Sequence, residues 1–379
     1  MKPASPMPEP LVVDAEPWTA REIRQQPETL RQTVAMLSQD RDRIEAFVNP
    51  LLARENLRII LIGAGTSAFI GDSLSPWLSR KLGRAVESIA TTDIVSAPEL
   101  YLRSDTPTLL VSFGRSGSSP ESIAAVDLAD QLVDEAYHLV ITCNADGALA
   151  KRSGDETLVV VLPDATHDRG FAMTSSFTAM TMAALAILGN SMTEARISAI
   201  ADAVEATHAR SLSLTQELAT RDFERVVYLG SGVFTGLARE AALKLMELSD
   251  GRIVTAFDSA LGFRHGPKTI VNDRTLIVLF VSNDPLTRCY DLDMLIELRR
   301  DGRSGSVWAV SAQDIEGDVL TVPDMAGAPD VDLLFPFITF AQLFGYQVSQ
   351  RLGLDPDQPN ASGTVNRVVR GVRIHPFGA

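Results

Sequence analysis

The stretch RIILIGAG (residues 58–65) returns later in the chain as RVVYLGSG (residues 225–232). Two further strand-like stretches, TLLVSF and LVITCN, begin at residues 108 and 139, and their counterparts TLIVLF and SVWAVS begin at residues 275 and 306. The offset is 167 residues in every pair (225 − 58, 275 − 108 and 306 − 139). Because three segments recur in one order and at one spacing, the sequence predicts a duplicated domain.

Each copy alternates short runs of Val, Ile and Leu with longer segments of helical periodicity. Such runs indicate strands that are buried on both faces, hence parallel sheets covered by helices. Crossovers between parallel strands are right-handed as a rule. We therefore expect an α/β fold with two tandem domains, each a doubly wound, flavodoxin-like parallel sheet flanked by helices. The expected domains span residues 56–210 and 222–355.

The remaining segments lie outside the two copies. Residues 1–17 are rich in Pro and acidic residues, which predicts a disordered leader. Residues 18–55 predict one or two N-terminal helices, in which Pro27 is a plausible helix-start residue. Residues 356–379 form a C-terminal tail that we expect to lie over the functional site.

Net charge, hydropathy and the spacing of Cys and His residues argue against several classes of partner and cofactor. The net charge of −14 argues against nucleic acid or an anionic membrane surface as the partner. The longest uncharged stretch, Phe171 to Thr193, is too polar to span a bilayer, which favours a buried helix. Cys143 and Cys289 share no CxxC spacing, as expected of reduced thiols in a cytoplasmic protein. No histidine pattern suggests a metal, so we expect neither metal nor cofactor.

Three unusual loops follow strands of the first copy: GAGTS (63–67), SFGRSGSSPES (112–122) and THDRGFAMTSSFT (166–178). Glycine lets a ligand approach the backbone, hydroxyls donate hydrogen bonds, and a helix N-terminus offers free N–H groups. Together they predict a phosphate site. Each loop alone could be an ordinary turn, with Ser118 or Ser119 only a helix cap ahead of Pro120.

The second copy has no such run of Ser and Gly. Its counterpart of the middle loop reads LFVSNDPLTRC. We therefore expect only the first copy to hold phosphate. GAGTS also departs from the GxGxxG pattern with a distal acidic residue, so NAD is not expected.

A charged stripe lies in REAALKLMELSDG (239–251), where Glu240, Lys244 and Glu247 fall at i, i+4 and i+7. The other positions are mostly apolar, so the helix should be buried and its stripe should line a cleft. The alternative is a surface Glu240–Lys244 pair of little consequence.

These motifs resemble the sugar isomerase (SIS) domain, in which Ser/Thr loops hold the phosphate of a phosphosugar. REAALKLMELSDG and FRHGPKT resemble the isomerase half of glucosamine-6-phosphate synthase. With the tail SGTVNRVVRGVRIHPF, the chain is most similar to the AgaS-type tandem SIS family of tagatose-6-phosphate ketose/aldose isomerases and galactosamine-6-phosphate deaminases. The resemblance runs from EIRQQPE to the C-terminal HPF.

The resemblance implies a substrate site. Its candidate residues are Gly65, Thr66, Ser67, Ser112, Arg115, Ser116, Ser118, Ser119, Asp168, Thr174, Ser175 and Glu240. Gly114 stands where the family often has serine, so Ser112 or backbone amides would substitute for that hydroxyl. The synthase's C-terminal lysine has no match here, and Asn366 or Arg367 occupies its neighbourhood.

Three residues are expected to carry the chemistry. Glu247 would shuttle a proton between C1 and C2, because a partly buried carboxylate can be tuned to neutral pH. Lys244 would stabilise the enediolate oxygen. His265, in FRHGPK, would open the pyranose ring. By resemblance, the His265 loop reaches the site of a second subunit, which implies a homodimer.

The expected substrate is a small phosphorylated amino sugar. The leading function is conversion of galactosamine 6-phosphate to tagatose 6-phosphate and ammonia. The alternatives are deamination of glucosamine 6-phosphate and aldose–ketose isomerisation without loss of nitrogen. A non-catalytic phosphosugar sensor is a further alternative from a different class.

Overall fold

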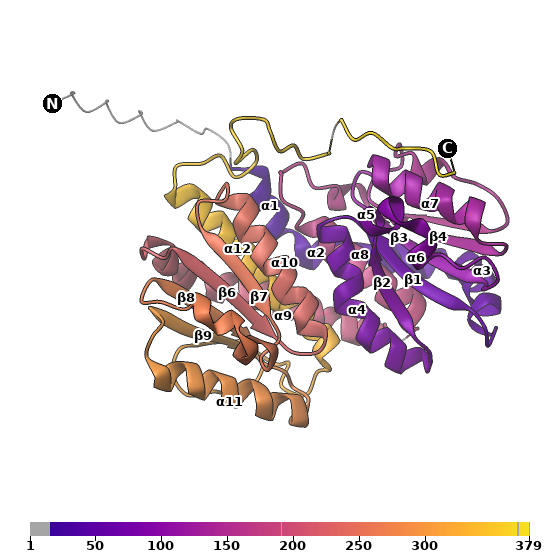
Figure 1. Cartoon of the computed structure of the whole chain (residues 1–379). Coiled ribbons are helices and arrows are strands. Elements are labelled where there is room, and N and C mark those ends of the chain that lie inside the picture. The colour runs from indigo at the N-terminus through magenta and orange to yellow at the C-terminus, as the bar shows by residue number, and fades with distance from the viewer. Residues whose placement is uncertain (1–15, 191, 370, 379) are drawn as a thin grey trace.

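A computed structural model describes residues 16–190, 192–369 and 371–378. Apart from Glu16 and Pro17, the predicted leader lies outside the described residues. Two five-stranded parallel sheets stand side by side, with helices packed around them (Figure 1). The first sheet has the order β2-β1-β3-β4-β5, and the second has the order β7-β6-β8-β9-β10. Both orders are flavodoxin-like, which confirms the predicted fold.

The strands coincide with the apolar runs in the sequence. The first sheet contains β1 (Arg58–Gly63), β2 (Val86–Ala90), β3 (Thr108–Gly114), β4 (Ala136–Thr142) and β5 (Thr157–Val161). The second contains β6 (Arg225–Gly230), β7 (Val254–Asp258), β8 (Thr275–Phe280), β9 (Ser306–Ser311) and β10 (Val319–Thr321).

Helices precede, connect and follow the strands. Those before and within the first copy are α1 (Trp18–Arg24), α2 (Gln26–Gln39), α3 (Arg41–Leu52), α4 (Thr66–Leu82), α5 (Thr91–Ser96), α6 (Pro98–Tyr101), α7 (Pro120–Leu132) and α8 (Ser175–Gly189). The others are α9 (Glu194–Thr220), α10 (Val233–Leu248), α11 (Pro285–Asp301) and α12 (Asp330–Arg351).

The duplication is visible in backbone geometry. Strands β1 and β6 begin 167 residues apart, as do β3 and β8. Gly65 and Gly232, also 167 residues apart, precede α4 and α10 with φ values of +56° and +59°. This left-handed conformation favours glycine, so both copies use the same strand-to-helix turn.

The N-terminal segment forms three helices, where we expected one or two. Pro27 lies in the first turn of α2, as predicted. Because Pro27 has no N–H, it cannot continue the hydrogen bonds of α1 into α2. The side chain of Gln26 donates to the Ile23 carbonyl instead (2.9 Å).

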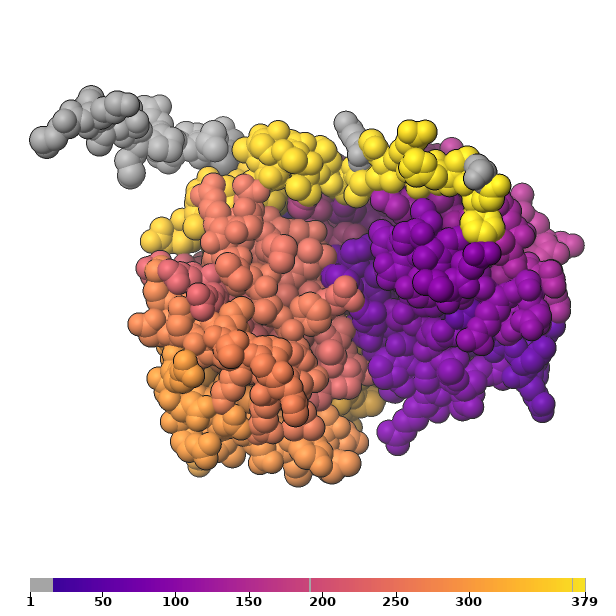
Figure 2. Space-filling model, viewed as in Figure 1, coloured from indigo at the N-terminus to yellow at the C-terminus, as the bar shows by residue number. Residues whose placement is uncertain are grey.

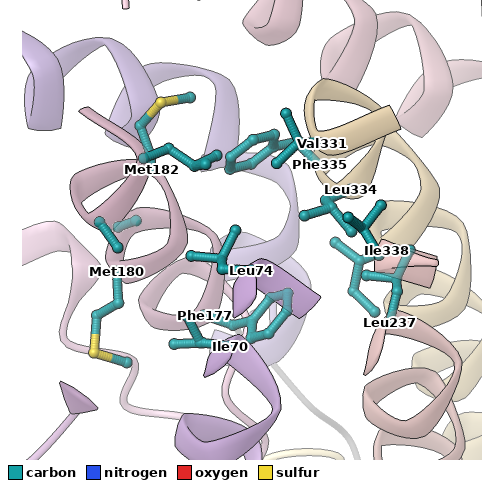
Figure 3. Packing of buried hydrophobic residues seen from close by; sticks show 14 of the residues in the cluster. Ile70, Leu74, Phe177, Met180, Met182, Leu237, Val331, Leu334, Phe335 and Ile338 are labelled. Carbon is teal, nitrogen blue, oxygen red and sulfur yellow. The ribbon is translucent and has the colours of Figure 1, made fainter. Parts of the chain in front are cut away.

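The first domain was expected to end at residue 210. That residue falls inside α9, which runs unbroken to Thr220 and packs along α12 of the second copy. One hydrophobic cluster also crosses from one copy to the other. It joins Ile70, Leu74 and Phe177 of the first copy to Leu237, Leu334 and Phe335 of the second (Figure 3). The two copies therefore share a core.

One helix, α12, is long and apolar enough to cross a membrane by length and composition. However, 94% of its apolar window is buried inside the protein, which identifies it as a core helix. Helix α8 occupies most of the uncharged stretch from Phe171 to Thr193 and is almost entirely buried, as predicted.

The C-terminal tail runs along one side of both copies (Figures 1 and 2). Near its start, Asp357 accepts hydrogen bonds from the backbone and hydroxyl of Thr19 (both 2.8 Å). Asn360 Nδ2 then donates to Asp250 Oδ1 (2.8 Å), just beyond α10. Farther on, the carbonyl of Arg367 accepts from Arg115 Nη2 (2.7 Å), just beyond β3. The tail thus bridges the end of α10 and the carboxyl edge of the first sheet.

Candidate active site

Helices α4 and α10 pack against each other and bring the two copies together (Figure 1). The contact is close because Gly236 of α10 has no side chain. A Cβ atom at Gly236 would lie 2.5 Å from the backbone nitrogen of Ser73 in α4. This glycine therefore sets how closely α10 approaches the GAGTS loop at the start of α4.

Thr66 of that loop meets the charged stripe of α10. Lys244 Nζ donates to Thr66 Oγ1 (3.0 Å) and pairs with Glu247 Oε2 (2.6 Å) and Glu240 Oε1 (3.4 Å). Thr66 Oγ1 also lies 3.3 Å from Glu240 Oε1. A loop of the first copy and a helix of the second therefore form one hydrogen-bonded cluster.

Burial rules out the surface-pair alternative for Glu240 and Lys244. Both side chains are fully buried, whereas the side chain of Glu247 is 24% exposed. Burial raises the pKa of Glu240 to about 8, against the opposing attraction of Lys244. Burial by itself would lower the pKa of Lys244, but the carboxylates of Glu240 and Glu247 outweigh it and raise that pKa.

With its pKa raised, Lys244 is an ammonium near neutral pH. The raised pKa of Glu240 favours the protonated form of that carboxyl at the same pH. Atom Oε2 of Glu240 is buried and has no partner among the described residues. The cluster therefore contains a neutral acid, an ammonium and the more exposed Glu247, which are the groups that a proton transfer at a polarised carbon requires.

The middle loop lies beside GAGTS because β3 pairs with β1, with Ser112 opposite Ile62. Ser112 is buried, and its hydroxyl has no partner among the described residues. Ser116 and Ser119 are half-buried, and Ser118 is exposed. Ser119 precedes α7 as its N-cap residue, but its oxygen accepts no hydrogen bond from the N–H groups of the helix, and its hydroxyl donates to Ser122 Oγ (2.6 Å). Side-chain capping is therefore not the role of Ser119.

Arg115 has a structural role within this loop. Its buried guanidinium donates to the carbonyls of Gly170 (3.2 Å), Phe171 (3.0 Å) and Arg367 (2.7 Å). It thereby ties the middle loop to the third loop and to the tail. A direct contact between Arg115 and a substrate remains a prediction.

The third loop does not offer the free N–H groups that we expected. The fully buried Asp168 carboxylate accepts from the backbone N–H groups of Thr174 (2.7 Å), Ser175 (3.1 Å) and Ser176 (2.9 Å). The protein's own anion thus occupies the N-terminus of α8. Asp168 positions this loop, and its expected contact with the sugar remains a prediction.

Sequence reasoning missed Glu22 of α1, which supports the same loop. Glu22 accepts from the backbone N–H groups of Arg169 and Gly170. Burial, reinforced by the negative charge of Asp168, raises its pKa to about 7. A side chain at Gly170 would collide with Thr19 and Glu22. Glu22 lies outside the repeated units, in the EIRQQPE segment where the family resemblance begins, and this membership was the one signal in the sequence that could have found it.

The tail residues Asn366 and Arg367 differ in their contacts. Arg367 donates to the Asp168 backbone carbonyl, whereas Asn366 donates to Gly363 within the tail (3.1 Å). Arg367 therefore anchors the tail on the third loop.

Among the described residues, His265 forms no hydrogen bond or ion pair with this cluster. It ends a short 3-10 turn, η3 (Gly262–His265), and is exposed. The structure therefore brings Thr66, Glu240, Lys244 and Glu247 together but does not bring His265 to them.

The second copy fills the matching edge of its sheet with carboxylates. The buried Asp291 accepts from Ser231 Oγ (2.6 Å) and the Ser282 backbone (3.0 Å). Asp330 accepts from the Asn283 backbone (2.7 Å) and the Ser282 hydroxyl, and Asp284 caps α11. Across the described parts of the chain, no cluster of three or more His, Cys, Asp or Glu residues suits a metal ion.

Comparison with known proteins shows which family this chain resembles. The SIS domain model matches residues 51–188. D-galactosamine-6-phosphate deaminase AgaS of Escherichia coli is 46% identical over 96% of this chain and 96% of its own length. The AgaS deaminase of Shewanella sp. is 46% identical over 95% and 92%. A crystal structure of tagatose-6-phosphate ketose/aldose isomerase from E. coli superposes with a TM-score of 0.91 at 43% identity, covering 98% of this chain and 100% of that one.

Proposed function

The chain belongs to the AgaS-type family of tandem SIS-domain proteins, and we propose that it converts galactosamine 6-phosphate and water to tagatose 6-phosphate and ammonia. The observation that carries the proposal is the bond from Lys244 to Thr66. This bond joins the acid–base stripe of α10 to a loop that the family uses for phosphate.

The phosphate group would bind at the first copy. The donors would be the GAGTS loop, with Gly65, Thr66 and Ser67, and the hydroxyls of Ser112, Ser116, Ser118 and Ser119. These groups make an anion site without lysine or arginine at the phosphate. The third loop, with Asp168, Thr174 and Ser175, would support this site and contribute few donors of its own.

Proton transfer would then be centred on Glu247. In the open-chain amino sugar, Glu247 removes the proton from C2 and returns it to C1, which leaves an imine at C2. Water adds to that imine and displaces ammonia, so that tagatose 6-phosphate remains. Lys244 stabilises the negative charge that develops on the substrate oxygen. Neutral Glu240 donates a hydrogen bond in the same pocket.

Ring opening is assigned to His265. We place it at the active site of a second subunit in a homodimer, because it is exposed and the family resemblance puts this loop at a partner's site. Imidazole can move a proton between the O1 hydroxyl and the ring oxygen near neutral pH. We also place the protein in the cytoplasm, since Cys143 and Cys289 are free thiols.

The test is ammonia release from galactosamine 6-phosphate and glucosamine 6-phosphate, measured in parallel without added cofactor. We expect ammonia from the galacto substrate, with a higher kcat/KM than from the gluco substrate. The reverse ratio would establish the glucosamine alternative. If neither substrate releases ammonia and the protein interconverts unaminated hexose phosphates, it is an aldose–ketose isomerase that does not remove nitrogen. Binding without any turnover would favour the sensor.

A further inference from the structure

The loop that carries His265 is clamped to helix α11 from both sides. Arg264, one residue before His265, donates from Nε to Glu297 Oε2 (2.8 Å). Lys268, three residues after it, donates from Nζ to Glu297 Oε1 (2.5 Å) and to Asp301 Oδ2 (2.5 Å). Each oxygen of one carboxylate therefore holds one side of the loop.

The other restraints on the loop lie on either side of His265, at Phe263 and at Ile270, whose carbonyl accepts from Arg225 Nη1 (2.7 Å). Phe263 is buried in the core of the second copy and fixes the first turn. Gly266 then adopts a φ of +124°, between η3 and the following 3-10 turn, η4 (Pro267–Ile270). Neither turn pairs with a strand, and His265 itself is exposed.

The clamp is more than a chance surface contact. The side chain of Glu297 is only 23% exposed, and that of Lys268 is 24% exposed. Isolated exposed ion pairs contribute little to stability, but a partly buried network with several charges restrains geometry better. Its two cations are also the charged residues that flank the proposed ring-opening histidine in sequence.

We propose that Glu297 is a positioning residue for catalysis, which holds His265 in the orientation required for ring opening. This inference rests on the proposed function, because it assumes that His265 acts on the substrate. A displacement of about 1 Å at a reacting group can cost on the order of 100-fold in rate. Loss of these ion pairs should therefore lower the rate of catalysis, although Glu297 itself is not proposed to contact the substrate.

The experiment compares Glu297→Ala, His265→Asn and the double variant with galactosamine 6-phosphate as substrate. We expect His265→Asn to lower kcat about 100-fold, within the usual range for a general acid–base group. Glu297→Ala should lower kcat about tenfold with KM within about twofold, and Glu297→Asp should restore part of the loss. In the His265→Asn background, Glu297→Ala should add nothing, because its effect passes through His265.

Glu224→Ala is the matched control, since Glu224 forms an ion pair with Arg274 in the same domain and neither residue pairs with Arg264, Lys268 or Glu297. It should leave kcat unchanged. Thermal unfolding and light scattering of each variant report folding and assembly. The inference is overturned if Glu224→Ala lowers kcat equally, if the effects of Glu297→Ala and His265→Asn are additive, or if Glu297→Ala dissociates the dimer.

Failure of the inference is distinguishable from failure of the proposed function. A slow His265→Asn variant beside a fully active Glu297→Ala variant overturns only the positioning role. A fully active His265→Asn variant removes His265 from the mechanism, and the positioning role falls with it.

Discussion

The two copies treat the carboxyl edge of their sheets differently. In the first copy, the loops after β1 and β3 are built from glycine and hydroxyl residues, and the hydroxyl of Ser112 has no partner within the part of the chain that the structure describes. In the second copy, Asp291, Asp330 and Asp284 accept hydrogen bonds from the corresponding turns. The corresponding turns would thus face the proposed phosphate in the first copy, whereas they face internal carboxylates in the second.

The difference teaches how a duplicated fold divides its labour. A buried carboxylate accepts hydrogen bonds from the backbone N–H groups of a turn and makes the turn rigid. The same negative charge repels a second anion. The second copy can therefore act as a scaffold that delivers α10 to the edge of the first copy. The third loop of the first copy shows the same arrangement at a single helix, because the Asp168 carboxylate accepts hydrogen bonds from the backbone N–H groups at the N-terminus of α8.

The largest effect should come from the helix that the second copy contributes. Glu247→Gln removes the base while keeping the shape of the side chain, so kcat should fall by at least about 1,000-fold. The substrate should still bind, because the phosphate loops are untouched. Steady-state kinetics and calorimetric titration measure the two quantities. A near-normal kcat would mean that the second copy contributes no base.

The proposed difference in phosphate binding between the two copies is tested by removing hydroxyl groups from each copy. Ser116→Ala combined with Ser119→Ala should raise KM about 150-fold in the first copy, because each lost hydrogen bond to a charged group contributes at least about 1.5 kcal/mol. Thr287→Ala, at the start of α11 in the second copy, is the control and should leave KM within about twofold. Equal effects in the two copies would contradict the division of labour.

Glu240 should control the alkaline limb of the pH profile. Its raised pKa, about 8, means that the carboxyl loses its proton above that pH and puts a negative charge beside Lys244 and Glu247. We expect wild-type kcat at pH 9 to be about tenfold below its value at pH 7. Glu240→Gln cannot ionise, so its profile should stay flat over this interval. A limb that persists in Glu240→Gln belongs to another group.

The smallest effect concerns stability. Burial raises the pKa of Asp291 to about 6, above its usual value of 3.8. The native state therefore holds the Asp291 proton more tightly than the unfolded chain does. This contribution is complete below about pH 4 and is lost as pH rises through 6, a change of about 1 kcal/mol between pH 5 and pH 7.

Urea unfolding of the wild type and of Asp291→Asn at both pH values measures this change. In the variant, the asparagine Oδ1 can still accept from the Ser282 N–H, while its Nδ2 donates to Ser231 Oγ, so the overall stability should change little. Its stability should nevertheless depend on pH by about 1 kcal/mol less than that of the wild type. An unchanged dependence would show that Asp291 is not the titrating group.

The fold could be predicted because its signals are local and repeated. The apolar runs, the 167-residue offset and the glycines at positions 65 and 232 each act over a few residues. Helix periodicity likewise identified the face that carries Glu240, Lys244 and Glu247. The expected boundary at residue 210 falls inside α9, and no helix-breaking residue separates α9 from the second copy.

The rest of the site depends on contacts between distant segments. The bond from Lys244 to Thr66 spans 178 residues. The role of Asp168 as a cap depends on a turn that no motif describes, and Glu22 lies outside the repeats. The residue of the first copy that lies 167 positions before Asp291 is Ala124, which carries no carboxylate. This difference between the copies was the one feature of the sequence that could have pointed to the role of Asp291.

The shared core has a consequence for how the chain is made. During synthesis the first copy leaves the ribosome before α10 and α12 exist. Until then, Ile70, Leu74 and Phe177 lack their partners on those helices (Figure 3). Since α12 ends at Arg351, nearly the whole polypeptide must emerge before this apolar surface is covered. A nascent chain of about 220 residues should therefore depend on chaperones, and a fragment of that length should aggregate when expressed alone.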